Sequence, residues 1–157
     1  MKKLFTIVFL VLATLISLYT KAQPMVSKTA FDNPAIQSQA DSIKTVYAMQ
    51  GFELSKASGM NMESENEVPV ILQLKEGTNY RIVFIGENSS NSCEVRMFDW
   101  NEKQVVYKKQ TSGDVDGNII AYNYSPKSTE YHMIKPVQTN KQKAIGGYFM
   151  IFKKTTP

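Results

Sequence analysis

The sequence predicts an antiparallel β-sandwich of jelly-roll or related Greek-key type, with seven or eight strands preceded by one amphipathic α-helix. Three observations support this fold class. Apolar residues recur at helical spacing between residues 34 and 50, and from residue 52 onward they alternate with a period of two. Each alternating run is short and ends at residues typical of turns, as in all-β sandwiches.

The N-terminal residues 1–23 have the layout of a secretory signal peptide, similar to bacterial ones. Two lysines precede an apolar run over residues 4–19, and a polar stretch with a small residue follows. The run of about 16 residues is short for a membrane span, which needs roughly 20. We therefore expect cleavage after Ala22 or Gln23 and export to the periplasm, cell surface or medium, with no membrane span after cleavage. An uncleaved anchor is the alternative.

One helix is predicted over residues 34–50, after a leader without periodicity at residues 24–33. Pro34 suits a first helical turn, and Gly51 supplies a stop. The apolar positions of this segment form one stripe at i, i+4, i+7 and i+11, namely Ile36, Ala40, Ile43 and Tyr47. The stripe packs on the following domain, or it docks a partner protein.

The sandwich domain is predicted over residues 52–154. A first strand is expected in "FELSKASGM", directly after the helix. Further alternating runs cover residues 68–74, 80–85, 93–98, 105–107, 120–124, 131–133 and 148–152. The segments between them, such as "KEGTN" and "SPKST", are rich in turn residues.

Charge and cysteine content exclude several function classes. The precursor has 18 basic and 14 acidic residues, and three of the basic ones lie in residues 1–23, so the rest of the chain is nearly neutral. Such a chain lacks the basic footprint of a nucleic-acid-binding protein. Cys93 is the only cysteine, which excludes an internal disulfide and a zinc thiolate cluster. Its alternating neighbours predict that it is buried.

Four segments resemble the bacterial pre-peptidase C-terminal domain. "PVILQLKEGTNYRIVFIG" is similar to its opening strands and "EVRMFDWNEKQVVY" to its middle strands, where an aspartate precedes a hairpin. "SPKSTEYHMIKPV" and "GGYFMIFKK" are similar to its closing strands. The resemblance covers residues 52–154, and it implies a secreted β-sandwich accessory module.

The sequence has few residues of the types that usually act in catalysis. His132 is the only histidine, so a nucleophile and base pair would have to be built from His132 and Cys93. No glycine-rich loop follows a strand and opens a helix, which argues against nucleotide chemistry. No spacing singles out a pair of carboxylates. We therefore expect no enzymatic activity.

Aromatic residues are the candidates for ligand binding. Trp100 lies in the turn "DWNEK", where a tryptophan is often exposed and can stack on a sugar ring. Tyr122 and Tyr124 share one face of a strand, which is a ligand platform if it faces solvent and core packing if it faces inward. The sequence leaves both alternatives open.

The segment "TSGDVDGNII" is the candidate metal site. Asp114, Asp116 and Asn118 offer three oxygen-bearing side chains on alternate residues, and calcium prefers six to eight oxygen ligands. The segment lacks the later acidic ligand of an EF-hand, so a calcium site would need a neighbouring loop. The pair Asp116-Gly117 is equally typical of a type I′ hairpin turn. No other cofactor is expected.

These observations favour an exported, non-catalytic accessory module that binds an envelope or secreted protein. The alternative is a carbohydrate-binding module that holds a polysaccharide on Trp100 and exposed tyrosines. The two hypotheses differ in which part of the surface carries exposed aromatic side chains.

Overall fold

The computed structural model describes residues 33–155, so the predicted signal peptide and all of the predicted leader except Asn33 lie outside the described residues. Helix α2 covers Pro34–Met49 and is followed by eight strands. The strands are β1 (Phe52–Glu63), β2 (Val70–Leu74), β3 (Tyr80–Ile85), β4 (Ser92–Phe98), β5 (Gln104–Thr111), β6 (Ile119–Tyr124), β7 (Glu130–Thr139) and β8 (Ala144–Lys154).

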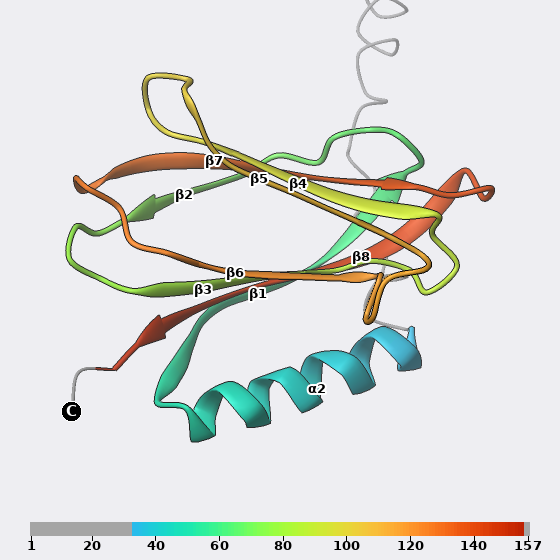
Figure 1. Ribbon diagram of the computed structural model, residues 1–157, viewed down its shortest axis with the longest axis horizontal. Coiled ribbons are helices and arrows are strands. Elements are labelled where there is room, and N and C mark those ends of the chain that lie inside the picture. Colours follow the sequence, from blue (N-terminus) through green and yellow to red (C-terminus); the bar gives the residue numbers. More distant parts are fainter. Residues whose placement is uncertain (1–32, 156–157) are drawn as a thin grey trace, which may run out of the picture.

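The strands form two four-stranded antiparallel sheets that pack face to face (Figure 1). The first sheet has the order β1-β8-β3-β6 and the second the order β2-β7-β4-β5. Strands are thus paired from the ends of the chain inward: β1 with β8, β2 with β7, β3 with β6 and β4 with β5. This order is that of a jelly roll. The predicted fold class is confirmed, including the helix that precedes the sandwich.

The main core lies between the sheets and is built by the inward-facing residues of every strand pair. Phe84, Val95, Met97, Ile134 and Phe149 are completely buried there. In β4 and β7 the burial alternates with a period of two, as the sequence pattern predicts for strands with one buried face. Strands β3 and β8 are instead buried on both faces, because helix α2 covers the outer face of the first sheet.

Helix α2 packs on the outer face of the first sheet. It lies along the outer face of the first sheet (Figure 1) and forms a second apolar cluster with it. The helix contributes Ile36, Ala40 and Tyr47, which pack on Val83, Ile85, Tyr148, Met150 and Phe152 of the sheet. The predicted helical stripe therefore serves as core. Within residues 33–155, no helix has the length and apolar character needed to cross a membrane.

Polar side chains attach both ends of the helix to the sheet. Asn33 caps the helix by accepting hydrogen bonds from the first-turn amides, and its Nδ2 donates to Glu87 Oε2 at 2.9 Å. At the other end, Arg81 Nε donates to the Tyr47 hydroxyl at 3.0 Å. These contacts show that the helix packs on the sandwich, which was one of the two alternatives left open by the sequence.

Candidate functional site

The two sheets differ in what covers their outer faces. Helix α2 covers the first sheet, whereas no other element of residues 33–155 lies over the second sheet (Figure 1). The uncovered face nevertheless has large apolar side chains. We call this set the outer-face patch, and it consists of Ile71, Phe98, Trp100, Tyr131 and Met133.

Strand register brings the members of the patch together. Ile71 of β2 lies opposite Met133 of β7, and Met133 lies opposite Phe98 of β4. Tyr131 is two residues from Met133 and so projects from the same face. Ile71 is 58% exposed, Tyr131 49% and Trp100 69%. The patch is therefore a contiguous apolar surface in water, which in single-chain proteins often marks a binding site.

Trp100 and Tyr131 form the aromatic part of the patch. Their ring centroids lie 6.1 Å apart with an interplanar angle of 47°. This tilted arrangement is within the range of favourable aromatic pairs. The two rings contact each other and also remain half or more exposed, so they present a wide aromatic surface at the end of the second sheet.

The turn that carries Trp100 is held by its own hydrogen bonds. The Asp99 carboxylate accepts from the backbone amides of Asn101 and Lys103, both at 2.9 Å. Glu102 adopts φ 59°, the left-handed conformation that closes the turn. The indole is thus presented by an ordered turn, which lowers the entropy lost when a ligand binds.

A network of charges borders the patch. Glu67 accepts from Arg96 at 3.0 Å and lies 2.8 Å from Lys135 Nζ, and Arg96 also pairs with Glu94. The hydrogen bond that Lys135 donates is the main cause that lowers the pKa of Glu67, and the hydrogen bond that Arg96 donates to Glu94 is the main cause that raises the pKa of Arg96. Tyr107 donates to Glu94 at 3.1 Å. The patch therefore has an ion-paired polar border.

Tyr122 and Tyr124, for which the sequence left a ligand platform and core packing open, face inward. Tyr122 is only 5% exposed, its hydroxyl points to Met97 Sδ at 3.7 Å, and burial raises its pKa. Tyr124 is half-buried against the same core, with its hydroxyl 2.9 Å from His132 Nε2. A platform that includes Tyr122 is therefore wrong, because β6 turns this face toward the core. Tyr131, on a neighbouring sheet, lies beside Trp100.

Two of the three side chains of the candidate metal site, those of Asp114 and Asn118, have separate partners. Asp114 Oδ2 accepts from the Thr111 amide at 2.7 Å, which folds the carboxylate back on its own turn. Asn118 Nδ2 donates to the Gly86 carbonyl and to Asn88, and its amide also pairs with Gln39 of the helix. Within residues 33–155 no group of three or more acidic, histidine or cysteine side chains is placed to hold a metal ion.

The only cysteine and the only histidine lie far apart. Both are buried and both face the core from the second sheet. Cys93 lies opposite Gln138 of β7, and His132 is six residues earlier on that strand. At about 3.3 Å per residue the two side chains are about 20 Å apart. Burial also raises the pKa of the Cys93 thiol to about 12, so this pair is not a nucleophile and base.

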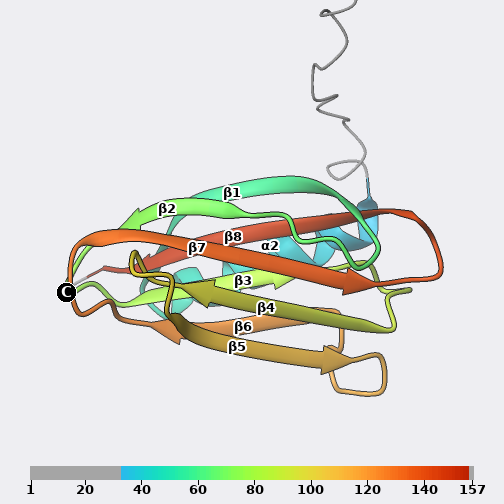
Figure 2. The same cartoon turned by 90° about the horizontal axis from the view of Figure 1, so that it is seen from above.

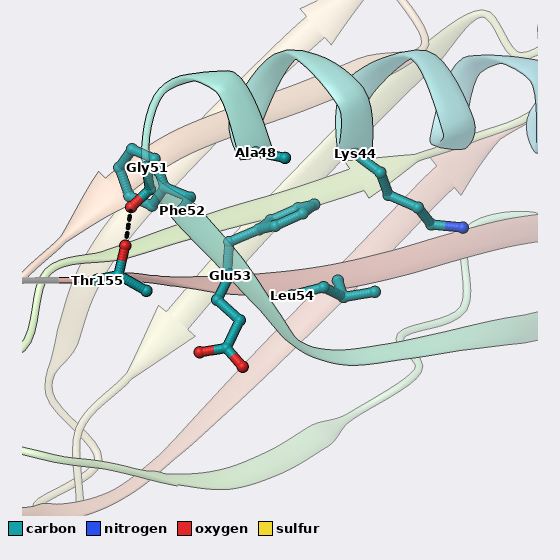
Figure 3. A pocket seen from close by; sticks show the side chains of 8 residues that line it. Lys44, Ala48, Gly51, Phe52, Glu53, Leu54 and Thr155 are labelled. Atoms are coloured by element: carbon teal, nitrogen blue, oxygen red, sulfur yellow. Dashed lines mark hydrogen bonds between the residues drawn. The ribbon is translucent and has the colours of Figure 1, made fainter.

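A shallow groove of about 390 Å³ lies on the helix side of the molecule (Figure 3). It runs between the last turns of helix α2 and the first residues of β1, and Ala48, Phe52 and Leu54 supply its apolar lining. The Thr155 hydroxyl donates to the Gly51 carbonyl at 2.8 Å and closes one end. The groove marks where the helix and β1 diverge.

No family model matches the chain, and no curated protein matches it. Among solved structures, the chain is similar to PliG, a periplasmic inhibitor of g-type lysozyme from Aeromonas hydrophila, with 11% identity, a TM-score of 0.45, and 67% of this chain and 90% of that one covered. A CBM4 structure shares 13% identity and a TM-score of 0.41, covering 71% of this chain and 83% of that one. These values assign no family, ligand or partner, and of the resemblance to the pre-peptidase C-terminal domain only the β-sandwich architecture is supported.

Proposed function

We propose that this chain is an exported, non-catalytic binding module that holds a protein partner on the outer face of its second sheet. The observation that carries the proposal is the outer-face patch. It joins Ile71, Trp100 and Tyr131, each about half exposed or more, to the half-buried Phe98 and Met133. Aromatic residues are enriched at the energetic centres of protein interfaces, and Met is enriched in interfaces generally.

The composition of the patch favours a protein over a sugar. Ile71 has no hydrogen-bonding group and Met133 has only a weakly accepting thioether, so they suit the apolar centre of a protein interface. The ion pairs of Arg96, Glu67 and Lys135 lie at its border, as polar rims do around such centres. Export is supported by the N-terminal lysines and the apolar run over residues 4–19.

A carbohydrate ligand is the second candidate, and one observation favours it. Trp100 is 69% exposed and is held on an ordered turn by Asp99, so its ring is free to stack on a pyranose. In that case the envelope ligand is a polysaccharide, and the aliphatic members of the patch contribute little to binding.

Two matched double variants test the proposal in the cells that produce the protein. Ile71→Ser with Trp100→Ala alters the patch, and Val46→Ser with Met49→Ala alters exposed apolar residues on the helix side. After chemical cross-linking in the envelope, a partner is identified by mass spectrometry and its binding is reconstituted with purified components.

We expect the patch variant to bind the purified partner at least about tenfold more weakly, while the helix-side variant binds like the wild type. Equal binding by the two variants overturns the protein-partner proposal. Quenching of Trp100 fluorescence by a purified envelope polysaccharide, with no cross-linked protein that depends on the patch, favours the carbohydrate candidate instead.

A further inference from the structure

A cleft of about 550 Å³ opens at the sandwich edge formed by β1 and β2. Figure 2 shows these two strands, one from each sheet, along the same edge of the molecule. Residues of both sheets line the cleft, so it lies between the layers and away from the outer-face patch. Its volume is within the range of about 300–1,000 Å³ that is usual for small-molecule sites.

The inner wall of the cleft is apolar. It consists of Leu72, Leu74, Tyr80 and Ile151, and all four pack in or against the main core. Tyr80 is the only one of these with a polar group, and its hydroxyl accepts a hydrogen bond from the Lys75 amide at 3.0 Å. Leu74 and Ile151 are at most 2% exposed, so Leu72 supplies most of the apolar surface that an alkyl chain can reach.

A β-bulge in β1 explains how Lys56 reaches the mouth of this cleft. Leu54 pairs with Phe152 and Lys56 with Ile151, so Ser55 is an extra residue in β1. A bulge changes which face the following residues occupy and bends the strand. Lys56 consequently lies opposite the core residue Ile151, at the mouth of the cleft.

The mouth of the cleft is positively charged. Lys56, Lys75 and Lys153 line it, and no carboxylate within residues 33–155 does so. Lys153 pairs with Glu53 at 3.2 Å, outside the cleft lining, whereas none of the ion pairs in this part of the chain involves Lys56 or Lys75. Two ammonium groups are therefore available to an anion beside an apolar wall.

We propose that this cleft binds an amphiphile with one anionic head group, of the fatty-acid type. The alkyl chain lies over Leu72, above the buried side chains of Leu74 and Ile151, and the carboxylate lies between Lys56 and Lys75. Lysines on edge strands also prevent edge-to-edge aggregation. That protective role requires a charge of either sign, whereas ligand binding requires a positive one, and this difference makes the proposal testable.

The test is calorimetric titration of the protein, purified in the form that cells accumulate, with three probes. Decanoate has the chain and the anionic head, decylammonium has the chain with the opposite charge, and acetate has the head without the chain. All are used below the concentration at which decanoate forms micelles. We expect decanoate to bind at least about tenfold more tightly than either of the other probes.

Charge reversal supplies the matched variants. Lys56→Glu with Lys75→Glu keeps a charged edge and should weaken decanoate binding at least about tenfold and strengthen decylammonium binding. Lys108→Glu with Lys109→Glu makes the same charge change on β5, at the opposite edge of the second sheet, and should leave decanoate binding unchanged. Methyl resonances of Leu72 and Ile151 should shift with decanoate in the wild type.

Three results overturn the proposal. The first is absence of decanoate binding, and the second is equal weakening by both charge-reversal pairs, which indicates a general effect of net charge. The third is tight binding of a glutamate-rich peptide that depends on Lys56 and Lys75 without decanoate binding, because the site would then recognise an acidic protein segment. Circular dichroism of each variant separates loss of binding from loss of fold.

Discussion

The hydroxyl of Tyr47 in helix α2 accepts a hydrogen bond from Arg81 Nε in β3 at 3.0 Å, and the guanidinium lies over the same ring at 5.1 Å. Tyr47 also packs edge-on against Phe152, with ring centroids 5.1 Å apart. The last turns of the helix are thus attached to the first sheet by one residue that combines apolar packing with a charged hydrogen bond.

We expect Tyr47→Phe to lower the free energy of unfolding by about 1–2 kcal/mol, because it removes a hydrogen bond from a charged donor and keeps the ring. Tyr47→Ala removes the ring as well and should cost about 3–5 kcal/mol. Urea denaturation followed by circular dichroism measures both. If the two variants are equally stable, the ring contributes nothing and the helix is not part of the cooperative fold.

Gln138 has a comparable role at the other end of the sandwich. Its buried side chain accepts from the Glu87 amide at 2.7 Å and from Ser90 Oγ at 2.8 Å, and it donates to the Gly146 carbonyl at 2.9 Å. Gln138→Leu removes these three hydrogen bonds from a buried position, and the Ser90 hydroxyl keeps only the hydrogen bond that it accepts from Asn140. We expect a loss of at least about 3 kcal/mol, since each unsatisfied buried group costs about 1–3 kcal/mol.

The matched control is Gln142→Leu, in the exposed loop after the same strand, which should change stability by less than about 0.5 kcal/mol. Thermal and urea unfolding of both variants provide the comparison. A Gln138→Leu protein as stable as this control means that the three hydrogen bonds add nothing to the fold.

The sequence pattern predicts the fold class well because it depends on local periodicity. Alternation along residues 93–98 gives a strand with one buried face, and the stripe ending at Tyr47 gives the helix. The run over residues 131–133 also lies in a strand, but its apolar residues Tyr131 and Met133 face outward while His132 faces the core. The pattern also predicts that Cys93 is buried, and the structure confirms this. It does not give strand pairing, because register between distant strands depends on contacts that no local pattern encodes. The order of the strands in each sheet therefore requires the structure.

The candidate site was predictable only in part. Trp100 is identifiable from its position in a turn, but its neighbour Tyr131 is not, since β4 and β7 are separated by two strands in the chain. Ile71 does carry a local signal, because it occupies the outward position of a strand whose alternate residues pack in or against the core. Tyr122 and Tyr124 show the limit of strand alternation as a signal. Alternation places both side chains on one face of the strand, but it does not say whether that face is buried.

Burial of Cys93 gives a prediction about reactivity and pH. Burial raises the pKa of its thiol from 9.0 to about 12. Below pH 9 the thiol is protonated in both the folded and the unfolded state. Between pH 9 and pH 12 the unfolded chain loses this proton and the folded protein keeps it, so the free energy of unfolding falls as pH rises.

We therefore expect the destabilisation caused by Cys93→Ala, measured by urea denaturation, to shrink between pH 9 and pH 12. A chromogenic disulfide reagent should react with the native thiol at pH 8 only as fast as the protein unfolds. Rapid reaction in the absence of denaturant contradicts the burial of Cys93, as does a Cys93→Ala effect that is constant across this pH range.

Trp100 is the only tryptophan in the chain, so its fluorescence reports directly on the outer-face patch. Because Tyr131 lies against one side of the indole, we expect Tyr131→Ala to increase quenching by acrylamide. Trp100→Ala should change the free energy of unfolding by no more than about 1 kcal/mol, since the side chain is largely exposed. Tyr107→Ala, on the same sheet, is the control and should leave quenching unchanged. Equal quenching in the wild type and Tyr131→Ala contradicts the contact between the two rings.

The loop at Asp114, Asp116 and Asn118 gives the last prediction. The Asp114 carboxylate accepts from Thr111, and the Asn118 side chain is occupied by Gly86, Asn88 and the helix. A calcium ion would have to break these hydrogen bonds before it gained its ligands. We expect the protein to melt at the same temperature with calcium and with a chelator. An ion present at about 100 times its dissociation constant would stabilise the fold by about 2.7 kcal/mol, so a calcium-dependent rise in the melting temperature that Asp114→Asn abolishes would show that this turn is a metal site.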